Sequence, residues 1–396
     1  MSKSDMTMTL SPEAQQEAVA GPIRRMLQFA FPDVVARTHH AVSTPNGFAE
    51  RLVYFWSNHF TVAGTKALTL PYPGVFEREA IRGHLTGSFS ELLLAVVRHP
   101  GMLLFLDQAQ SIGPGSTLGK RRGGGLNENL AREILELHTV GVRGGYGQAD
   151  VTELARALTG WTIVGERLLP LAPGATPGDF AFVAALHEPG ARKVMGRSYA
   201  ESGEDQAVAI LKDLARNPAT GRHVAVKLAT HFVADTPPSD LVEALTASFI
   251  KTEGDLPSLH RTLIDHPETW RMPSGKFKSS NDFLISSLRA TGSAPPLPRQ
   301  IVEAYGALGQ VPFRAPSPAG WPDDAASWAG ADAILKRLEW SQAYARQITL
   351  NERPLTLAQG ALGPALSGRT VEAVQRSESA VEGLVLALMS PEFQRR

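Results

Sequence analysis

Apolar residues recur every three or four positions along most of this chain, and this helical period constrains its fold more than any other feature. The spacing is clearest over residues 48–56, 89–96 and 126–137. A helix with this pattern has one apolar face, which must be buried against other elements. We therefore predict a mainly α, multi-helical globular protein.

Residues that begin and end helices support this prediction. Asp150, followed by Val151-Thr-Glu153, predicts a capping box, whereas Asn217 and Asp255 each lie just before a proline near a predicted helix start. The predicted stops are Gly160 and the pairs His99-Pro100 and His266-Pro267.

Two regions interrupt the helical pattern. Residues 111–125 contain seven glycines or prolines in fifteen positions, which predicts a mobile surface loop without regular structure. Its Lys120-Arg121-Arg122 triplet lacks the order of a phosphate-binding P-loop and favours a solvated tip or a protease-sensitive linker. Residues 161–199 contain short β-branched and aromatic runs between Pro/Gly clusters, which predicts a small β-hairpin insertion.

A Pro-rich patch at 293–298 predicts where a carboxy-terminal portion begins. We expect an amino-terminal helical segment (1–47), a main helical domain (48–292) that includes the glycine loop and the β-insertion, and a carboxy-terminal helical portion (299–396) packed on the main domain.

Composition excludes several classes of function. The chain has no cysteine, which removes disulfides, thiol nucleophiles, iron–sulfur clusters and covalent haem attachment, and leaves His, Asp and Glu as the strong metal ligands. Its 39 basic and 39 acidic residues cancel, so we expect no nucleic-acid partner. No run approaches the ~18 apolar residues of a membrane span. The first ten residues show no export signal, so as given the chain would be cytoplasmic.

The densest polar segment follows the glycine loop. In a helix, Glu128, Arg132 and Glu136 would lie at i, i+4 and i+8, with the guanidinium between two carboxylates. This stripe is either a solvated face with weak ion pairs or a buried polar network that faces a ligand. We expect Arg132 to be paired with Glu128 or Glu136 and to be mostly buried. On the second interpretation, Glu128, Glu136 and His138 are candidate catalytic residues, and Asn127, Asn129 and Arg132 are candidate anion-binding residues.

Two further clusters contain histidine. Asn58 and His59 lie within an aromatic-rich run, where His59 either lines a small-molecule pocket or belongs to a core helix. His187 lies just after the predicted hairpin, close to Lys193, and could be a ligand or an acid/base on a loop. We take His59 and His187 as candidate catalytic residues, and Asn58 and Lys193 as candidate binding residues.

Sequence-local catalytic motifs, including the zinc-protease helix, the hydrolase serine elbow and the dinucleotide fingerprint, are absent. Three long phrases instead closely resemble the bacterial domain of unknown function 1800 family: residues 50–62, residues 125–141 with Gly145-Tyr146, and residues 150–161. Shorter pieces, including residues 180–196 and 320–322, are also similar to that family. Within the third phrase, Asp150, Arg156, Gly160 and Trp161 are expected to be structural.

The resemblance implies a cellular location and a partner protein, but no particular reaction. Members are often exported, frequently with twin-arginine signals, and are commonly encoded beside a sulfatase- or phosphatase-like protein of the domain of unknown function 1501 family, which becomes the expected partner. The motifs become recognisable from about Phe48. The family's usual leader and first helical motif are not visible before that residue.

Two functions fit these residues. The first is a hydrolase-like enzyme with a His/Glu/Arg site on an anionic substrate, in which His and carboxylate side chains could also hold a divalent metal. The second is a non-catalytic helical assembly or escort protein for the phosphatase-like partner, with the same polar side chains forming a structural network. Convergence of His59, His138 and His187 at an open cleft would favour the enzyme.

Overall fold

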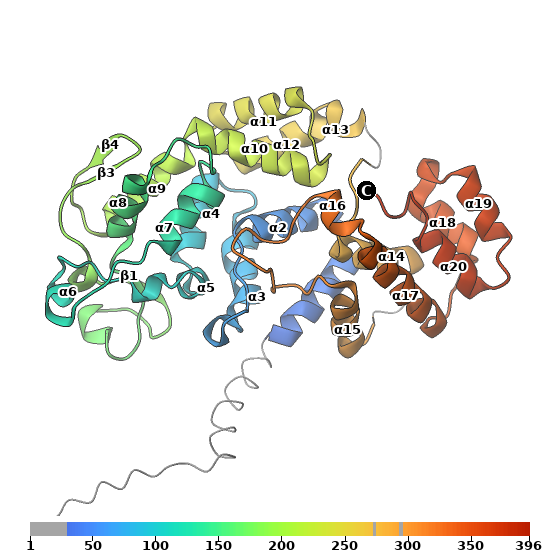
Figure 1. Ribbon diagram of the computed structural model, residues 1–396, viewed down its shortest axis with the longest axis horizontal. Helices are drawn as coiled ribbons and strands as arrows, with labels where there is room; N and C mark the ends of the chain where they lie inside the picture. Colours follow the sequence, from blue (N-terminus) through green and yellow to red (C-terminus); the bar gives the residue numbers. More distant parts are fainter. Residues whose placement is uncertain (1–29, 272–274, 293–295) are drawn as a thin grey trace, which may run out of the picture.

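The computed structural model describes residues 30–271, 275–292 and 296–396, and these residues are mainly helical (Figure 1). The expected amino-terminal segment 1–47 is therefore described only from residue 30, where a helix covers residues 30–43. Residues 293–295 of the expected Pro-rich boundary also lie outside the described residues. No helix among the residues described is long and apolar enough to cross a membrane.

The first group of helices precedes residue 272. In chain order they are α2 (Gly47–His59), α3 (Tyr72–Phe76), α4 (Phe89–Arg98), α5 (Pro100–Phe105), α6 (Thr117–Arg122), α7 (Asn129–Glu133), α8 (Gln148–Leu158), α9 (Glu204–Ala215), α10 (Pro218–Phe232), α11 (Ser239–Lys251), α12 (Leu256–Asp265) and α13 (Glu268–Arg271).

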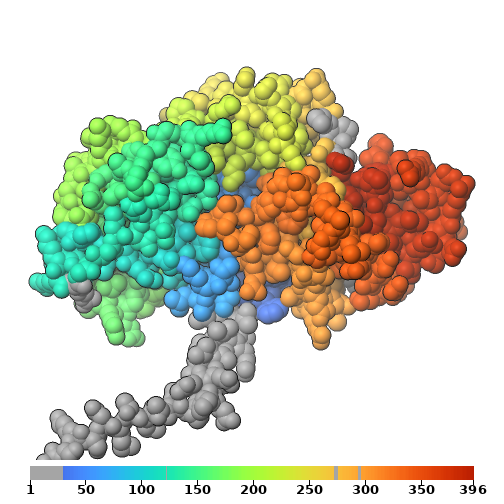
Figure 2. Space-filling view, viewed as in Figure 1, coloured from blue at the N-terminus to red at the C-terminus, as the bar shows by residue number. Residues whose placement is uncertain are grey.

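The second group follows residue 274. These helices are α14 (Ser280–Thr291), α15 (Pro298–Leu308), α16 (Ala325–Trp328), α17 (Ala331–Gln347), α18 (Pro354–Leu362), α19 (Gly368–Gln375) and α20 (Ala380–Leu388). They lie together on one side of the molecule, drawn in orange and red (Figure 2).

The strands form two separate antiparallel hairpins inside the expected window. Strand β1 (Trp161–Ile163) pairs with β2 (Phe180–Phe182), and β3 (Arg192–Val194) pairs with β4 (Arg197–Tyr199). The prediction of a mainly α protein with a small β-insertion is thus confirmed.

Gly160 ends α8 and starts the first hairpin as predicted. Its φ is +88°, and a Cβ there would approach the Phe182 ring to 2.9 Å. A left-handed backbone and this close approach both favour glycine. The neighbouring Trp161 side chain is fully buried.

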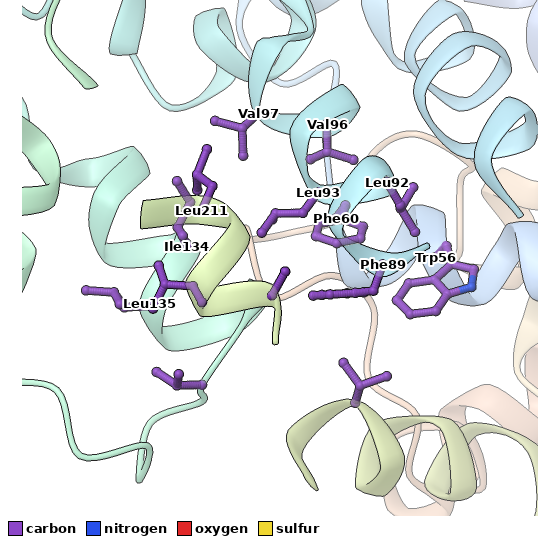
Figure 3. Packing of buried hydrophobic residues seen from close by; sticks show 14 of the residues in the cluster. Trp56, Phe60, Phe89, Leu92, Leu93, Val96, Val97, Ile134, Leu135 and Leu211 are labelled. Carbon is purple, nitrogen blue, oxygen red and sulfur yellow. The ribbon is translucent and has the colours of Figure 1, made fainter. Parts of the chain in front are cut away.

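Two hydrophobic clusters hold these elements. The larger cluster is built from residues 52–263, and Figure 3 shows its side chains from α2, α4, α9 and the segment after α7 pointing toward one another. The second cluster joins Val34, in the helix at 30–43, to α14, α15, α17 and α20. The helix at 30–43 therefore packs with elements almost the whole chain away.

Two local predictions were wrong. The glycine-rich stretch 111–125 contains the helix α6, because the Ser116 side chain caps it by accepting from the Gly119 N–H and Leu118 packs on a small apolar cluster. Helix α8 begins at Gln148 rather than after Asp150. Asp150 lies in the first turn and accepts from the Gly147 N–H, so its carboxylate stabilises the same helix start from inside. The caps at Asn217 and Asp255 are confirmed.

Candidate functional site

The Glu128/Arg132 stripe lies at the surface, where it joins α7 to α8. Glu128 accepts from the Thr152 hydroxyl at 2.7 Å, the Gln148 amide at 2.8 Å and Arg132 at 3.1 Å. These hydrogen bonds, that from Thr152 foremost, lower the pKa of Glu128. Arg132 is paired as expected, but its side chain is 40% exposed. The expectation of a buried guanidinium was wrong, because α7 presents this face to solvent.

The other polar residues of this segment are not gathered around one ligand site. Glu136 accepts from the Tyr146 hydroxyl at 3.4 Å. Asn127 accepts from the Asn129 N–H through its side-chain oxygen at 2.9 Å. Asn129 itself lines a pocket of about 310 Å³ together with Lys66. This pocket includes neither Arg132 nor any histidine.

His59 and His138 do lie together, but in the closed interior. Each is 1% exposed, and their ring centroids are 6.2 Å apart. The Nε2 atom of His59 lies 3.1 Å from the His138 carbonyl oxygen, whereas Nδ1 of both rings is buried without a partner in the described structure. Burial, and secondarily the charge of Lys227, lowers the pKa of His59 and brings that of His138 to about 3. Both rings are therefore neutral at pH 7.

His187 and Lys193 lie in the β-insertion, away from these two histidines. His187 Nδ1 is 2.8 Å from the Thr159 carbonyl oxygen, so the ring holds the loop after β2 against the end of α8. Lys193 is exposed on β3. The three histidines do not converge at an open cleft.

The expected structural residues take structural roles. The second carboxylate oxygen of Asp150 accepts from the Met195 N–H at 2.7 Å and joins the second hairpin to α8. Arg156 pairs with Glu153 at 2.5 Å on the same helix.

A polar pocket of about 90 Å³ lies where the two hydrophobic clusters meet. Clefts between packed units of a fold are common ligand sites. We call this the central pocket. Its walls come from the helix at 30–43, α2, α10, the start of α14 and the segment 310–323, and they include Arg37, Tyr54, Ser57, Asn58, His231, Asn281, Asp282 and Asp323.

His231 and Asp323 form a hydrogen-bonded dyad at this pocket. His231 Nδ1 is 2.8 Å and 3.1 Å from the two oxygens of Asp323. With the proton on Nδ1, the carboxylate accepts and Nε2 keeps its lone pair. That Nε2 atom is buried without a partner in the described structure. Burial lowers the pKa of His231 despite the neighbouring Asp323. Burial alone would raise the pKa of Asp323, but the hydrogen bond with His231 and the nearby charges of Arg396 and Lys276 hold it well below its usual range.

The loop that carries Asp323 is held from two sides. Asn58 donates to the Trp321 carbonyl at 2.8 Å and accepts from the Trp321 N–H at 2.7 Å. Gly320, with φ +85°, permits this approach, because a Cβ there would lie 2.5 Å from the Asn58 amide oxygen. Lys276 pairs with Asp235 at 2.5 Å and also donates to the Asp323 carbonyl. Asn58, expected to bind substrate, thus positions the loop of the dyad.

The opposite wall is polar and largely engaged. Arg37 donates to Glu77 at 2.8 Å and lies 3.7 Å above the Tyr54 ring. Ser57 donates to the same carboxylate at 3.1 Å. The Tyr54 hydroxyl is buried and has no partner in the described structure, and burial raises its pKa. A protonated, unengaged phenol therefore borders the pocket.

Sequence reasoning missed His231 and Asp323. A signal was present, because His223, Lys227 and His231 are spaced at i, i+4 and i+8 and lie on one helix, α10. The partner Asp323 lies 92 positions away, and only tertiary structure brings it there. Among the described residues, no group of three or more His, Cys, Asp or Glu side chains is placed to hold a metal ion.

Comparison with known proteins returned one match. The family model described as "Protein of unknown function (DUF1800)" matches residues 9–395, nearly the whole chain. The match thus extends toward the amino terminus beyond Phe48, where the recognisable motifs begin. Neither the curated proteins nor the solved structures contain a match to this chain.

Proposed function

This chain belongs to the DUF1800 family, and we propose that it is a hydrolase-like enzyme whose active site is the central pocket. One observation carries the proposal. His231 is oriented by Asp323 through Nδ1, while its buried Nε2 has no partner among the described residues. A buried lone pair without a donor costs free energy unless a ligand or water supplies one.

In the proposed reaction, His231 acts as a general base. A water molecule attacks the carbonyl carbon of the substrate, and its proton passes to Nε2 as the new C–O bond forms. Asp323 stabilises the resulting imidazolium through Nδ1–H. The Tyr54 hydroxyl donates a hydrogen bond to the oxygen on which negative charge develops. His231 then returns the proton to the leaving group as its bond to carbon breaks.

The charges around the pocket favour an uncharged scissile group. Asp323 and Asp282 contribute carboxylates, of which Asp282 is paired with Arg396 at 2.8 Å, and the guanidinium of Arg37 is already engaged by Glu77. An anionic group would have to approach these carboxylates without a free cation opposite it. We therefore propose an ester or amide substrate, instead of the anionic substrate that the Arg132 stripe had suggested.

The test compares hydrolysis of nitrophenyl acetate, nitrophenyl butyrate and an acyl nitroanilide by the parent and two variants. His231→Gln should lower kcat by about 10²- to 10⁴-fold, the range of general-base contributions. Asp323→Asn should lower it by a similar order, because the imidazolium loses its counter-charge.

The matched control is His260→Gln. His260 is 8% exposed and packs against Phe48, and it does not line the central pocket. This variant should keep parental kcat. The proposal would be contradicted if His260→Gln and His231→Gln lowered kcat equally. It would also be contradicted if the parent hydrolysed none of the three probes.

The second proposed function is a non-catalytic escort for a phosphatase- or sulfatase-like partner of the DUF1501 family. The closed packing of His59 and His138 favours it, because buried neutral rings at 1% exposure serve structure rather than proton transfer with solvent. Co-expression with the neighbouring gene product tests this function. A complex that survives size-exclusion chromatography, and that His231→Gln leaves intact, would support the escort over the enzyme.

A further inference from the structure

A second polar pocket, of about 730 Å³, lies between α14, α18 and the last residues of the chain. We call it the Lys278 pocket. In Figure 1, α14 and α18 both lie near the point where the chain ends. Its volume is within the usual range for small-molecule sites, about 300–1,000 Å³. It shares no lining residue with the central pocket.

Lys278 lines this pocket with an unpaired ammonium group. The residue is only 8% exposed. In the part of the chain that the structure describes, Nζ has neither a hydrogen-bond nor a carboxylate partner, and it lies 3.8 Å from the centroid of the Phe393 ring. A buried charge without a counter-ion is costly, and an aromatic face compensates only part of that cost.

The surroundings of Lys278 are also cationic. The pocket is lined by four basic residues, Lys278, Arg289, Arg395 and Arg396. It is also lined by two acidic residues, Glu352 and Glu392. Glu392 is already engaged, since it accepts from the Ser367 N–H at 2.9 Å. Arg337, which is fully buried, donates to the Lys278 carbonyl at 2.6 Å and adds positive charge behind the pocket.

We propose that the Lys278 pocket binds a small molecule through an oxyanion group, a phosphate, sulfate or carboxylate. The oxyanion would accept from Nζ of Lys278, with the exposed Arg395 adding to the attraction from the pocket wall. Arg396 is already paired with Asp282 at 2.8 Å. Charge-assisted hydrogen bonds of this kind are the strong ones in proteins. The site is separate from the proposed hydrolytic site and does not depend on it.

The state of Lys278 gives the site a pH signature. Burial, with the charges of Arg337, Arg396 and Arg51 and against that of Asp282, lowers the pKa of Lys278 to about 7. A bound anion favours the charged ammonium, so affinity should be highest below pH 7 and fall as the pH rises above it. Asp282 and Glu392, whose pKa values are lowered, stay ionised over this range.

The experiment is calorimetric titration of the full chain with sodium sulfate, whose charge is constant between pH 6 and pH 8. The parent should bind sulfate saturably and lose affinity toward pH 8. Lys278→Met should bind about 10- to 100-fold more weakly, which is the worth of one charge-assisted hydrogen bond. Parallel titrations with inorganic phosphate and with acetate identify which oxyanion is preferred.

Lys251→Met is the matched control. Lys251 is exposed at the end of α11, far from the pocket lining, and the substitution makes the same change of charge. It should leave sulfate affinity unchanged. Arg395→Ala, at an exposed position on the pocket wall, is the second variant should Lys278→Met fail to fold, and it should weaken binding several-fold.

Two results would overturn the site. One is the absence of saturable binding by the parent for all three anions. The other is equal sulfate affinity in the parent and in the folded Lys278 or Arg395 variant. Neither result bears on ester or amide hydrolysis, so the proposed function is tested independently of this site.

Discussion

At the scale of single residues, solvent exposure determines how much an ion pair contributes to the free energy of unfolding. Arg132 and Glu128 are joined at 3.1 Å, but their side chains are 40% and 29% exposed. Arg82, in contrast, donates to Glu50 and Glu77, whose side chains are 5% and 3% exposed. Solvent screens the first pair and not the carboxylates of the second.

We therefore predict that Arg132→Ala lowers the free energy of unfolding by less than about 1 kcal/mol, the value of an exposed pair. Arg82→Ala should cost about 3–5 kcal/mol, because it leaves the buried carboxylate of Glu50 without its arginine and removes one of the two arginines that pair with Glu77. Urea denaturation of both variants checks the difference. A loss as large for Arg132→Ala as for Arg82→Ala would show that α7 is buried against another element in solution.

At the scale of elements, three histidines are brought together by α2, α10 and the segment after α7. His59 lies 6.2 Å from His138 and 6.0 Å from His223, between ring centroids. Burial lowers the pKa of all three, and Lys227 on α10 adds to the effect. These elements pack with neutral rings, so protonation works against their packing.

Acid should therefore destabilise the fold. The pKa of His138 is about 3 when folded and near the ordinary histidine value of about 6.5 when unfolded, so between these values the unfolded state binds more protons. The free energy of unfolding should fall as pH drops below about 6.5, by up to ~1.4 kcal/mol per pH unit for each such histidine. His138→Gln should reduce that slope between pH 6.5 and pH 5 in urea denaturation.

The control for this slope is Lys251→Gln, an exposed substitution at the end of α11 that removes no histidine. It should keep the parental dependence on pH. Parallel curves for the parent and His138→Gln would mean that His138 is accessible to protons in the folded state.

At the scale of the whole molecule, buried charges join the two hydrophobic clusters. Arg37 comes from the helix that packs with the second cluster, and it donates to Glu77, which lies among residues of the first. Glu77 also accepts from Ser57 and Arg82. The central pocket lies beside this junction, so its walls depend on how the two clusters are held together.

Glu77→Gln should lower the free energy of unfolding by about 3–5 kcal/mol, because Arg37 would stay buried without its counter-charge. Glu303→Gln is the control. The Arg299 and Glu303 side chains are 88% and 58% exposed, so this substitution should leave the free energy of unfolding almost unchanged. Chemical denaturation followed by tryptophan fluorescence measures both. Similar midpoints for the two variants would contradict a role of Glu77 in joining the clusters.

The sequence by itself determined the elements of this protein and little of their function. The three-and-four spacing predicted the helices, Pro/Gly clusters placed the hairpins within 161–199, and Gly160 required a left-handed backbone, because these preferences arise from neighbouring residues. The sequence analysis did not predict helix α6, because the seven glycines and prolines around it indicated a loop more strongly than the single cap residue Ser116 indicated a helix.

Only the tertiary structure decided which polar residues meet. Spacing along a helix placed Arg132 between carboxylates, but which face of α7 is covered depends on distant elements. His231 contacts Asp323, which lies 92 positions later in the sequence. Lys278 is shielded from solvent by Phe393 and by Arg337 of α17. Burial and charge pairing between remote segments set exposure and pKa, and a helical period carries no information about either.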